Sequence, residues 1–166
     1  MKIEVHAASK TYPIFMEKGI LSRAAEIIGR NGHVFLISDD GVDIRWRNML
    51  KEQYPDAGMY VFANGEANKN FDTLQEILKA MQEAHVSRKD TVIALGGGVV
   101  GDMAGFASAI YMRGIPYINI PTTTLSQIDS SIGGKTAIDF NGIKNSVGAF
   151  QQPDMVLIDV DVLSTL

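Results

Sequence analysis

Cysteine is absent from the 166 residues, so disulfide bonds and thiolate metal sites are excluded. This composition is compatible with a reducing compartment, and we expect a cytoplasmic protein. Basic residues are also few, because 15 Lys and Arg residues face 19 Asp and Glu residues and form no cluster. The balance argues against a nucleic-acid partner, since nucleic-acid-binding surfaces are strongly basic.

Long apolar runs are missing as well. No stretch approaches the roughly 18 apolar residues that span a bilayer, and the N-terminus has no long apolar core of the kind found in signal peptides. The histidines His6, His33 and His85 have no spacing typical of metal ligands, so the sequence predicts no metal site built from them. The length suits one globular domain, which we expect to cover residues 1–166.

Apolar segments alternate with amphipathic ones along most of the chain. Strands that are apolar throughout and are separated by helices are typical of a parallel sheet covered on both faces. We therefore expect a Rossmann-like α/β fold, in which the two N-terminal strands form an antiparallel hairpin and Asn70 caps a helix. The predicted strands are 3–7, 12–16, 34–37, 60–63, 91–95, 117–120 and 155–158, and the predicted helices are 19–29, 44–54, 71–81 and one from the glycine run to about 112.

A glycine run, Gly96–Gly101, satisfies the pattern G-x-G-x-x-G between a predicted strand and a predicted helix. Glycines in this place let the backbone approach a pyrophosphate, and the start of the helix attracts the anion. The acidic residue usual about 20 positions later is missing, because residues 117–125 contain no Asp or Glu. A turn that only packs the helix on the sheet is the alternative. Asp102 is either a helix-dipole carboxylate or an acceptor for a ligand.

Further segments have two interpretations each. Thr122–Thr124 follows a strand and either caps the next turn or binds ribose and phosphate. Residues 130–136 end in Gly-Lys-Thr, but Asp129 stands where a P-loop needs its first glycine, so a nucleoside triphosphatase is disfavoured. Lys135, and the Lys144-Asn145 pair in a predicted turn, are solvated groups or an anion site. Arg113 at a helix end is a dipole partner or a clamp on an anion.

The chain closes with a short predicted helix. Asp161 could cap a helix that begins at Val162, but only five residues remain. A helix of under two turns is marginal alone. We therefore expect that the element continues and that a second domain follows.

Together these segments resemble the 3-dehydroquinate synthase family. The matching stretches are Gly96–Asp102, Tyr111–Ile115, Pro121–Thr123, Asp129–Thr136 and Gly142–Asn145, in the order and spacing of the family. The resemblance implies an NAD-dependent cyclase that converts 3-deoxy-D-arabino-heptulosonate 7-phosphate to 3-dehydroquinate and phosphate in the shikimate pathway. It implies transient oxidation of the substrate, phosphate elimination, reduction and an intramolecular aldol step, with zinc or cobalt as a Lewis acid.

The resemblance also assigns residues. It implies that Asp39, Glu66 and Lys69 address the adenosine and its ribose, and that Gly97, Gly98 and Asp102 hold the pyrophosphate and its neighbours. On the same basis Thr122, Thr123, Leu125 and Thr165 line the cofactor. The substrate-side residues implied are Arg113, Asp129, Lys135, Lys144 and Asn145, and both of these lysines are also assigned to the cofactor. A substrate that bears phosphate and carboxylate needs such cations.

The family's metal ligands belong to a helical C-terminal domain beyond residue 166. We therefore expect this chain to bind NAD weakly and without turnover, and expect the full-length enzyme to be a homodimer. Another sugar phosphate cyclase, a glycerol-dehydrogenase-like enzyme and a non-catalytic nucleotide-binding module are the alternatives. Residues 126–149 are expected to form a mobile loop that closes over ligands.

Overall fold

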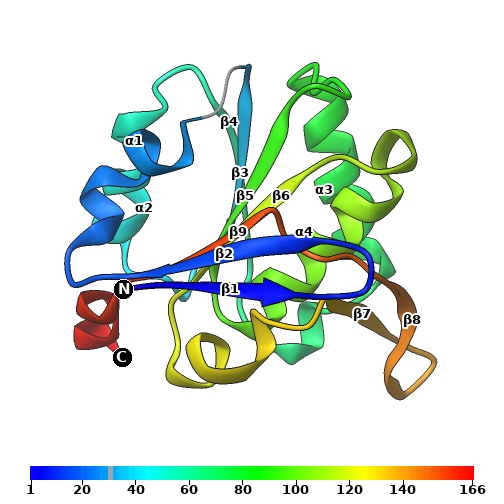
Figure 1. Ribbon diagram of the computed structural model, residues 1–166. Coiled ribbons are helices and arrows are strands. Elements are labelled where there is room, and N and C mark those ends of the chain that lie inside the picture. Colours follow the sequence, from blue (N-terminus) through cyan, green and yellow to red (C-terminus); the bar gives the residue numbers. More distant parts are fainter. Residues whose placement is uncertain (30–31) are drawn as a thin grey trace.

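The computed structural model describes residues 1–29 and 32–166, which form a seven-stranded sheet and a separate two-stranded hairpin (Figure 1). The strands are β1 (Lys2–His6), β2 (Thr11–Met16), β3 (Val34–Asp39), β4 (Gly58–Phe62), β5 (Thr91–Gly96), β6 (Tyr117–Pro121), β7 (Lys135–Phe140), β8 (Ile143–Phe150) and β9 (Met155–Ile158). The α-helices are α1 (Ala24–Ile28), α2 (Ile44–Gln53), α3 (Phe71–Glu83) and α4 (Gly98–Ile110). Shorter 3-10 helices cover Ile20–Arg23, Glu66–Asn68, Tyr111–Arg113 and Val160–Thr165, and a π-helix covers Ser126–Ser130.

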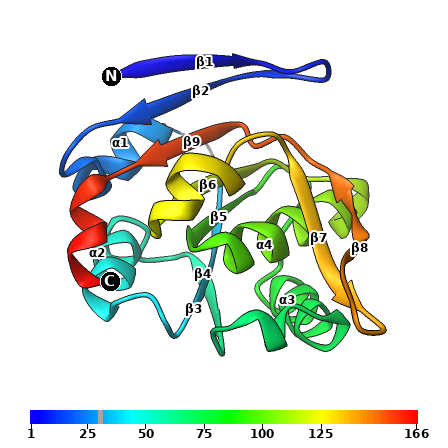
Figure 2. The same cartoon turned by 90° about the horizontal axis from the view of Figure 1, so that it is seen from below.

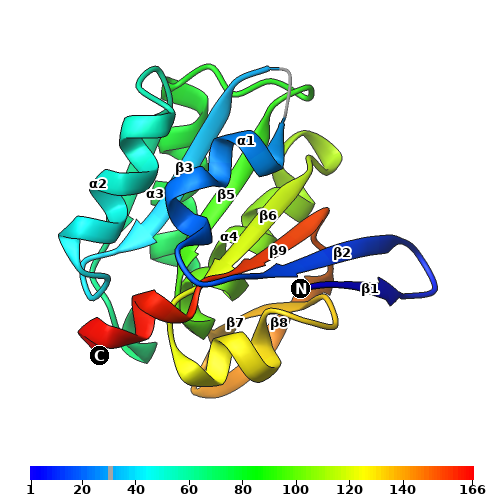
Figure 3. The ribbon, with the colours of Figure 1, turned by 60° about the vertical axis from the view of Figure 1, so that its left-hand side comes forward.

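The main sheet has the order β1-β2-β9-β6-β5-β3-β4 and is parallel except for β1. Figure 3 shows the strands side by side, with the β1–β2 hairpin extending past the body of the sheet. β1 pairs antiparallel with β2, so the expected N-terminal hairpin is confirmed. The mixed, mostly parallel α/β fold is the one that the alternation of apolar and amphipathic segments predicts.

Helices cover both faces of the sheet, as Figures 1 and 2 show. All six residues of β3 are buried because successive side chains enter different cores. Phe35 and Ile37 join a core with α3 and α4, whereas Val34 and Leu36 join a core with α1 and α2. The sheet is thus the middle layer of three, which explains why its central strands are apolar throughout.

Two helix ends test the expected caps. Asn70 caps α3, because its Oδ1 accepts a hydrogen bond from the Thr73 N–H at 2.9 Å, as predicted. The expected cap at Asp161 is wrong, because the last helix begins at Val160 and is capped by Asp159. Asp159 is only 2% exposed, and its carboxylate also accepts the N–H groups of Gly19 and Leu21 at 2.9 Å. This buried carboxylate after β9 therefore binds backbone donors of the last helix and of the Gly19–Leu21 segment together.

The interpretation of residues 126–149 as a loop is wrong. This segment contains the π-helix and most of the β7–β8 hairpin, which packs beside α4 in Figure 2. Ile138 is fully buried, but most of β8 is exposed and several glycines interrupt the segment, so the hydrophobic pattern of a strand is weak. Within residues 1–29 and 32–166, no helix has the length and apolar character needed to cross a membrane.

Candidate cofactor and substrate site

A cavity of about 350 Å³ lies at the point where the connections of the sheet diverge. β3 and β5 are neighbours, but β3 leads through α2 toward one edge of the sheet and β5 leads through α4 toward the other. Such a switch point leaves a crevice at the carboxyl ends of the strands, and nucleotides bind there in doubly wound folds. Residues after four strands line the cavity, among them Asp39, Asn64, Gly65, Gly97, Gly98, Thr122 and Thr123.

The glycine run forms the wall of this cavity at the start of α4. Gly97 is the N-cap residue and Gly98 is the first residue of the helix, so N–H groups without helical partners face this end. A Cβ on Gly97 would lie 3.1 Å from Thr123 Cγ2, and one on Gly98 would lie 3.1 Å from Ser130 Oγ. Glycine is therefore needed both for access to the backbone and for the close approach of the segment after β6. A packing role for the run is thus confirmed, and pyrophosphate binding stays a prediction.

Asp39 stands across the crevice, at the end of β3. It is 8% exposed, and its Oδ1 accepts a hydrogen bond from the Gly41 N–H at 3.1 Å. Burial raises the pKa of this carboxyl above its ordinary value, and the N–H groups of Gly41 and Val42 oppose the rise. An acidic group thus reaches this crevice from the strand next to β5, although none follows the glycine run in the sequence.

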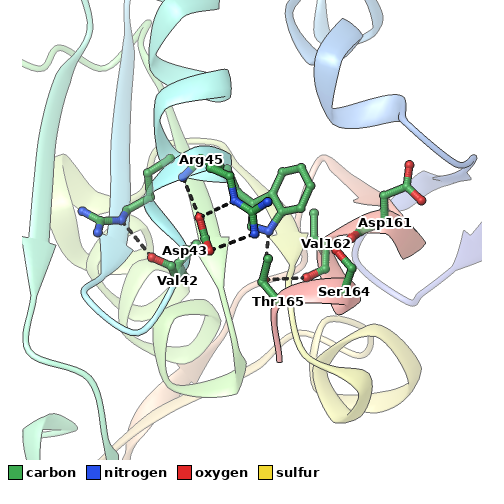
Figure 4. Close-up of polar contacts among 9 residues, drawn as sticks. Val42, Asp43, Arg45, Asp161, Val162, Ser164 and Thr165 are labelled. Atoms are coloured by element: carbon green, nitrogen blue, oxygen red, sulfur yellow. Dashed lines mark hydrogen bonds and ion pairs between the residues drawn. The ribbon is translucent and has the colours of Figure 1, made fainter.

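Threonines and the single tryptophan complete the cavity. Thr123 Oγ1 lies 2.8 Å from Ser126 Oγ, so this threonine both stabilises the start of the π-helix and lines the cavity. Thr165 Oγ1 accepts a hydrogen bond from Trp46 Nε1 at 3.0 Å, which ties the last helix to α2; Figure 4 shows Thr165 at this contact. Leu125 is not among the lining residues and is 70% exposed.

A second cavity of about 380 Å³ lies between α4 and the β7–β8 hairpin. It is lined by Asp102, Lys135, Thr136, Ala137, Asn145, Gly148, Ala149 and Phe150. Asp102 is on the first turns of α4, close in sequence to the glycines of the first cavity. The same helix therefore presents backbone N–H groups to one cavity and a carboxylate to the other.

Lys69 lies beside this second cavity. Its Nζ is 2.6 Å from Asp102 Oδ2 and 2.5 Å from Asn145 Oδ1, and 6% of its side chain is exposed. Burial raises the pKa of Asp102 above its ordinary value, and the Lys69 ammonium opposes that rise. Lys69 and Asp102 thus face the hairpin and are not among the residues that line the glycine cavity.

Glu66 and Lys144 are exposed residues beside the cluster formed by Lys69, Asp102 and Asn145. The Glu66 carboxyl lies beside that of Asp139, and burial followed by this contact raises the pKa of Glu66. The N–H of Asn145 lowers the pKa of Asp139. Sequence analysis missed Asp139, because its place beside Glu66 depends on a hairpin that was not recognised.

Two predicted substrate residues do not join the cluster. Arg113 follows the 13 residues of α4 and is exposed, at a point about 20 Å along the helix from the glycine run. Its backbone φ is 65°. Asp129 is an exposed residue of the π-helix and lines neither cavity. A substrate role for either residue remains a prediction.

No metal centre is present in the part of the chain that the structure describes. In residues 1–29 and 32–166, no group of three or more His, Asp and Glu side chains could hold a metal ion. His6, His33 and His85 lie in separate parts of the fold. The donor set of these residues does not fit a catalytic metal ion.

Comparison with known proteins places the sequence beside one family. The family model described as 3-dehydroquinate synthase N-terminal matches residues 59–166. The 3-dehydroquinate synthase of Neisseria gonorrhoeae is 45% identical over 99% of this chain and 47% of its own length. That of Clostridium acetobutylicum is 44% identical over 99% of this chain and 48% of its own length. The chain therefore spans about half the length of the curated relatives it matches.

Solved structures with the same fold include two synthases and a dehydrogenase. A 2-deoxy-scyllo-inosose synthase complexed with carbaglucose-6-phosphate, NAD⁺ and Co²⁺ aligns with a TM-score of 0.92 at 25% identity, over 99% of this chain and 47% of that one. A 2-epi-5-epi-valiolone synthase of Streptomyces hygroscopicus, with NAD⁺ and Zn²⁺ bound, has a TM-score of 0.84 at 30% identity, over 98% and 47%. A glycerol dehydrogenase of Schizosaccharomyces pombe, 19% identical with a TM-score of 0.67 over 90% and 37%, shares the fold.

Proposed function

Because this chain belongs to the 3-dehydroquinate synthase family, we propose that residues 1–166 are the NAD-binding domain of an enzyme that converts 3-deoxy-D-arabino-heptulosonate 7-phosphate to 3-dehydroquinate and phosphate. The observation that carries the proposal is the pair of cavities on either side of the start of α4. One has the glycine run and a buried acid, as a dinucleotide requires, and the other has lysine and amide groups, as a sugar phosphate requires.

The first cavity fits NAD⁺. Its pyrophosphate would meet the N–H groups at Gly97 and Gly98, and its ribose hydroxyls would donate to the Asp39 carboxylate. Trp46 and Thr165 line the part of the cavity formed by α2 and the last helix, where the adenine would lie. Bound NAD⁺ supplies a hydride acceptor next to the substrate and, once reduced, a hydride donor.

The second cavity fits the anionic substrate. Lys135 lines it and offers an ammonium group to a phosphate or carboxylate, and Lys144 lies in the same hairpin outside the lining. Asn145 adds an amide whose oxygen is already held by Lys69, which leaves its NH₂ group free to be offered to substrate oxygens. The Lys69–Asp102 pair fixes the floor of this site and keeps both side chains in one arrangement.

The described residues do not fit the metal ion that accompanies the two solved cyclases. We therefore propose that the ligands of a catalytic zinc or cobalt belong to a second domain outside residues 1–166, and that this chain alone binds NAD⁺ without turnover. The identity of 44–45% to 3-dehydroquinate synthases, against 25–30% to the inosose and valiolone synthases, favours the carboxylate-bearing substrate.

Calorimetric titration of NAD⁺ into the purified chain tests the cofactor site. We expect saturable binding that Asp39→Asn weakens about tenfold, since a charged acceptor for ribose hydroxyls is lost. Asp56→Asn, at an exposed position outside both cavities, is the matched control and should leave the affinity unchanged. Equal affinities in all three proteins would contradict the assignment of Asp39, and absence of binding would contradict the cofactor site in this chain.

A turnover assay tests whether the chain alone lacks part of the catalytic machinery. The chain, NAD⁺, a divalent metal and the heptulosonate phosphate are incubated together, and dehydroquinate and released phosphate are measured. We expect neither product. Product formation would show that the catalytic groups are complete within residues 1–166.

A further inference from the structure

The tip of the β7–β8 hairpin contains a bulge that carries Lys144 and Asn145. Ile138 pairs with Val147 and Phe140 pairs with Ile143, so residues 144–146 stand opposite Asp139 alone. Extra residues in one strand bend it and redirect its side chains, and such bulges are frequent beside functional sites. Here the bulge separates the two candidate substrate residues from the regular ladder of the hairpin.

Asn145 has a backbone conformation that needs support. Its φ is 54°, in the left-handed region that side-chain-bearing residues adopt only at a cost. Asp139 provides the support, because its Oδ1 accepts a hydrogen bond from the Asn145 N–H at 2.9 Å. A carboxylate acceptor makes this bond stronger than one between neutral groups.

Asp139 also attaches the hairpin to the segment that contains Lys69. Its own backbone N–H donates to the Lys69 carbonyl at 2.9 Å, and its carboxyl lies beside that of Glu66, whose pKa it raises. The same residue therefore holds the bulge on one side and the Glu66–Lys69 segment on the other. Figure 2 shows the hairpin beside α4, which is the helix that follows the glycine run.

The contacts continue from the bulge to the start of α4. The Asn145 amide oxygen accepts from Lys69 Nζ, and Lys69 is paired with Asp102 on the first turns of the helix. Asn145 and Asp102 both line the second cavity. The position of Asn145 at this cavity thus depends on a backbone that Asp139 holds.

Ser146 provides a comparison within the same tip. Its hydroxyl donates to the Ile143 carbonyl at 3.0 Å and to the Phe140 carbonyl at 3.4 Å. These bonds close the turn and make no contact with Lys69 or with the Asn145 side chain. The turn therefore has its own local support, whereas Asp139 holds the backbone of Asn145, whose side chain contacts Lys69.

We propose that Asp139 is a positioning residue, which fixes the Lys144–Asn145 bulge and ties it to Lys69 and Asp102 at the sugar phosphate cavity. What the cavity binds rests on the function proposed above. The role of Asp139 in holding the Asn145 backbone does not depend on that proposed function.

The test uses the whole chain with the variants Asp139→Ala, Asp139→Asn and Ser146→Ala. The Asp139→Asn variant would keep a side-chain oxygen for the Asn145 N–H, whereas the Asp139→Ala variant would not. Hydrogen exchange of the Asn145 amide is measured by NMR, with the amides of Val92 and Ile93 in β5 as a reference for the whole fold. In parallel, inorganic phosphate, standing for the phosphate group of the substrate, is titrated while the amides of Lys135 and Asn145 are followed.

We expect Asp139→Ala to raise exchange at Asn145 about tenfold without a change at Val92 and Ile93, and to weaken phosphate binding about tenfold. Asp139→Asn should retain most of the protection and affinity, and Ser146→Ala should resemble the unmodified chain in phosphate affinity. Unchanged exchange at Asn145 in Asp139→Ala overturns the inference. Equal acceleration in β5 also overturns it, because Asp139 would then be only a general stabiliser. If the unmodified chain binds no phosphate, the proposed function of the cavity fails and the exchange results alone decide the role of Asp139.

Discussion

Lys69 Nζ and Asp102 Oδ2 lie 2.6 Å apart, and only 6% of the Lys69 side chain and 18% of the Asp102 side chain are exposed. The pair joins the segment after β4 to the first turns of α4, and Asn145 from the hairpin completes the coordination of the ammonium. Charges removed from water in this way depend on each other, because either one alone would be left without a counter-charge.

Lys69→Met should therefore destabilise the chain by about 3 kcal/mol, the lower end of the cost of breaking a buried pair. Urea unfolding measures the difference, with Lys79→Met at an exposed position of α3 as the matched control, expected within about 0.5 kcal/mol of the unmodified chain. The added change Asp102→Asn should recover part of the loss, since no unpaired carboxylate remains. A loss below about 1 kcal/mol in Lys69→Met would contradict the buried pairing.

Asp39→Asn should stabilise the chain at pH 7 while it weakens NAD⁺ binding. Burial raises the folded-state pKa of Asp39, Asp40 adds to the rise, and Gly41, Val42 and Arg47 oppose it. A carboxyl with a raised folded-state pKa contributes stability below its ordinary pKa and loses that contribution as the pH rises through the raised value. The carboxylate therefore costs stability at pH 7, and the variant removes this cost.

Thermal unfolding between pH 4 and pH 8 checks this prediction. We expect a higher melting temperature for Asp39→Asn at pH 7 to 8 and a difference that shrinks toward pH 4. A variant that is less stable than the unmodified chain at pH 7 would mean that the hydrogen bonds of Asp39 outweigh its burial.

Gly105→Ala should destabilise the chain by about 1–3 kcal/mol, although alanine favours a helix by about 1 kcal/mol over glycine. The added Cβ would lie 2.4 Å from Thr136 Cγ2 and 3.2 Å from the Tyr117 ring, where α4 packs against β7 and β6. Thr136→Ser removes that methyl group and keeps the hydroxyl that donates to the Ala149 carbonyl. In the Thr136→Ser background, Gly105→Ala should cost less than half as much. A double-mutant cycle by chemical unfolding measures the coupling, and additive effects would contradict the contact.

NAD⁺ should quench the fluorescence of Trp46 saturably, because this side chain lines the first cavity and is the single tryptophan of the chain. AMP should quench it as well, whereas nicotinamide mononucleotide should not, since we place the adenine end beside Trp46 and Thr165. The midpoints should agree with calorimetry. NAD⁺ binding without a change in emission would contradict this orientation of the cofactor.

The sequence predicts most of the main sheet, because its signals are local. Apolar strands, the cap at Asn70 and the glycine run each occupy a few consecutive residues. The approach of Asp39 to the glycine run follows from the parallel pairing of β3 and β5. Motif spacing indicated the family even where its residues are far apart in the chain.

The β7–β8 hairpin and its contacts could not be predicted from local sequence signals. β8 is largely exposed, so it has no core face from which a strand could be recognised. The link between Lys69 and Asn145 spans 76 residues and depends on a bulge whose register no local pattern specifies. Arg113 differs, because its place at the end of the helix was expected from the sequence, and the length of α4 separates it from the glycine run with which motif spacing groups it.

The place of β9 between β2 and β6 determines the order in which this sheet can be assembled. The hairpin formed by β1 and β2 precedes the other strands of this sheet in the sequence. Its partner strand in the main sheet is nevertheless β9 (Met155–Ile158), which pairs with β2 at Ile14–Met16. Until β9 is made, the edge of β2 that pairs with it has no neighbouring strand. Bringing β2 and β9 together also closes the long loop between them, which has an entropic cost. We expect docking of this first hairpin to be the late and slow step of folding, so a chain released before Met155 would leave it as an unpaired edge.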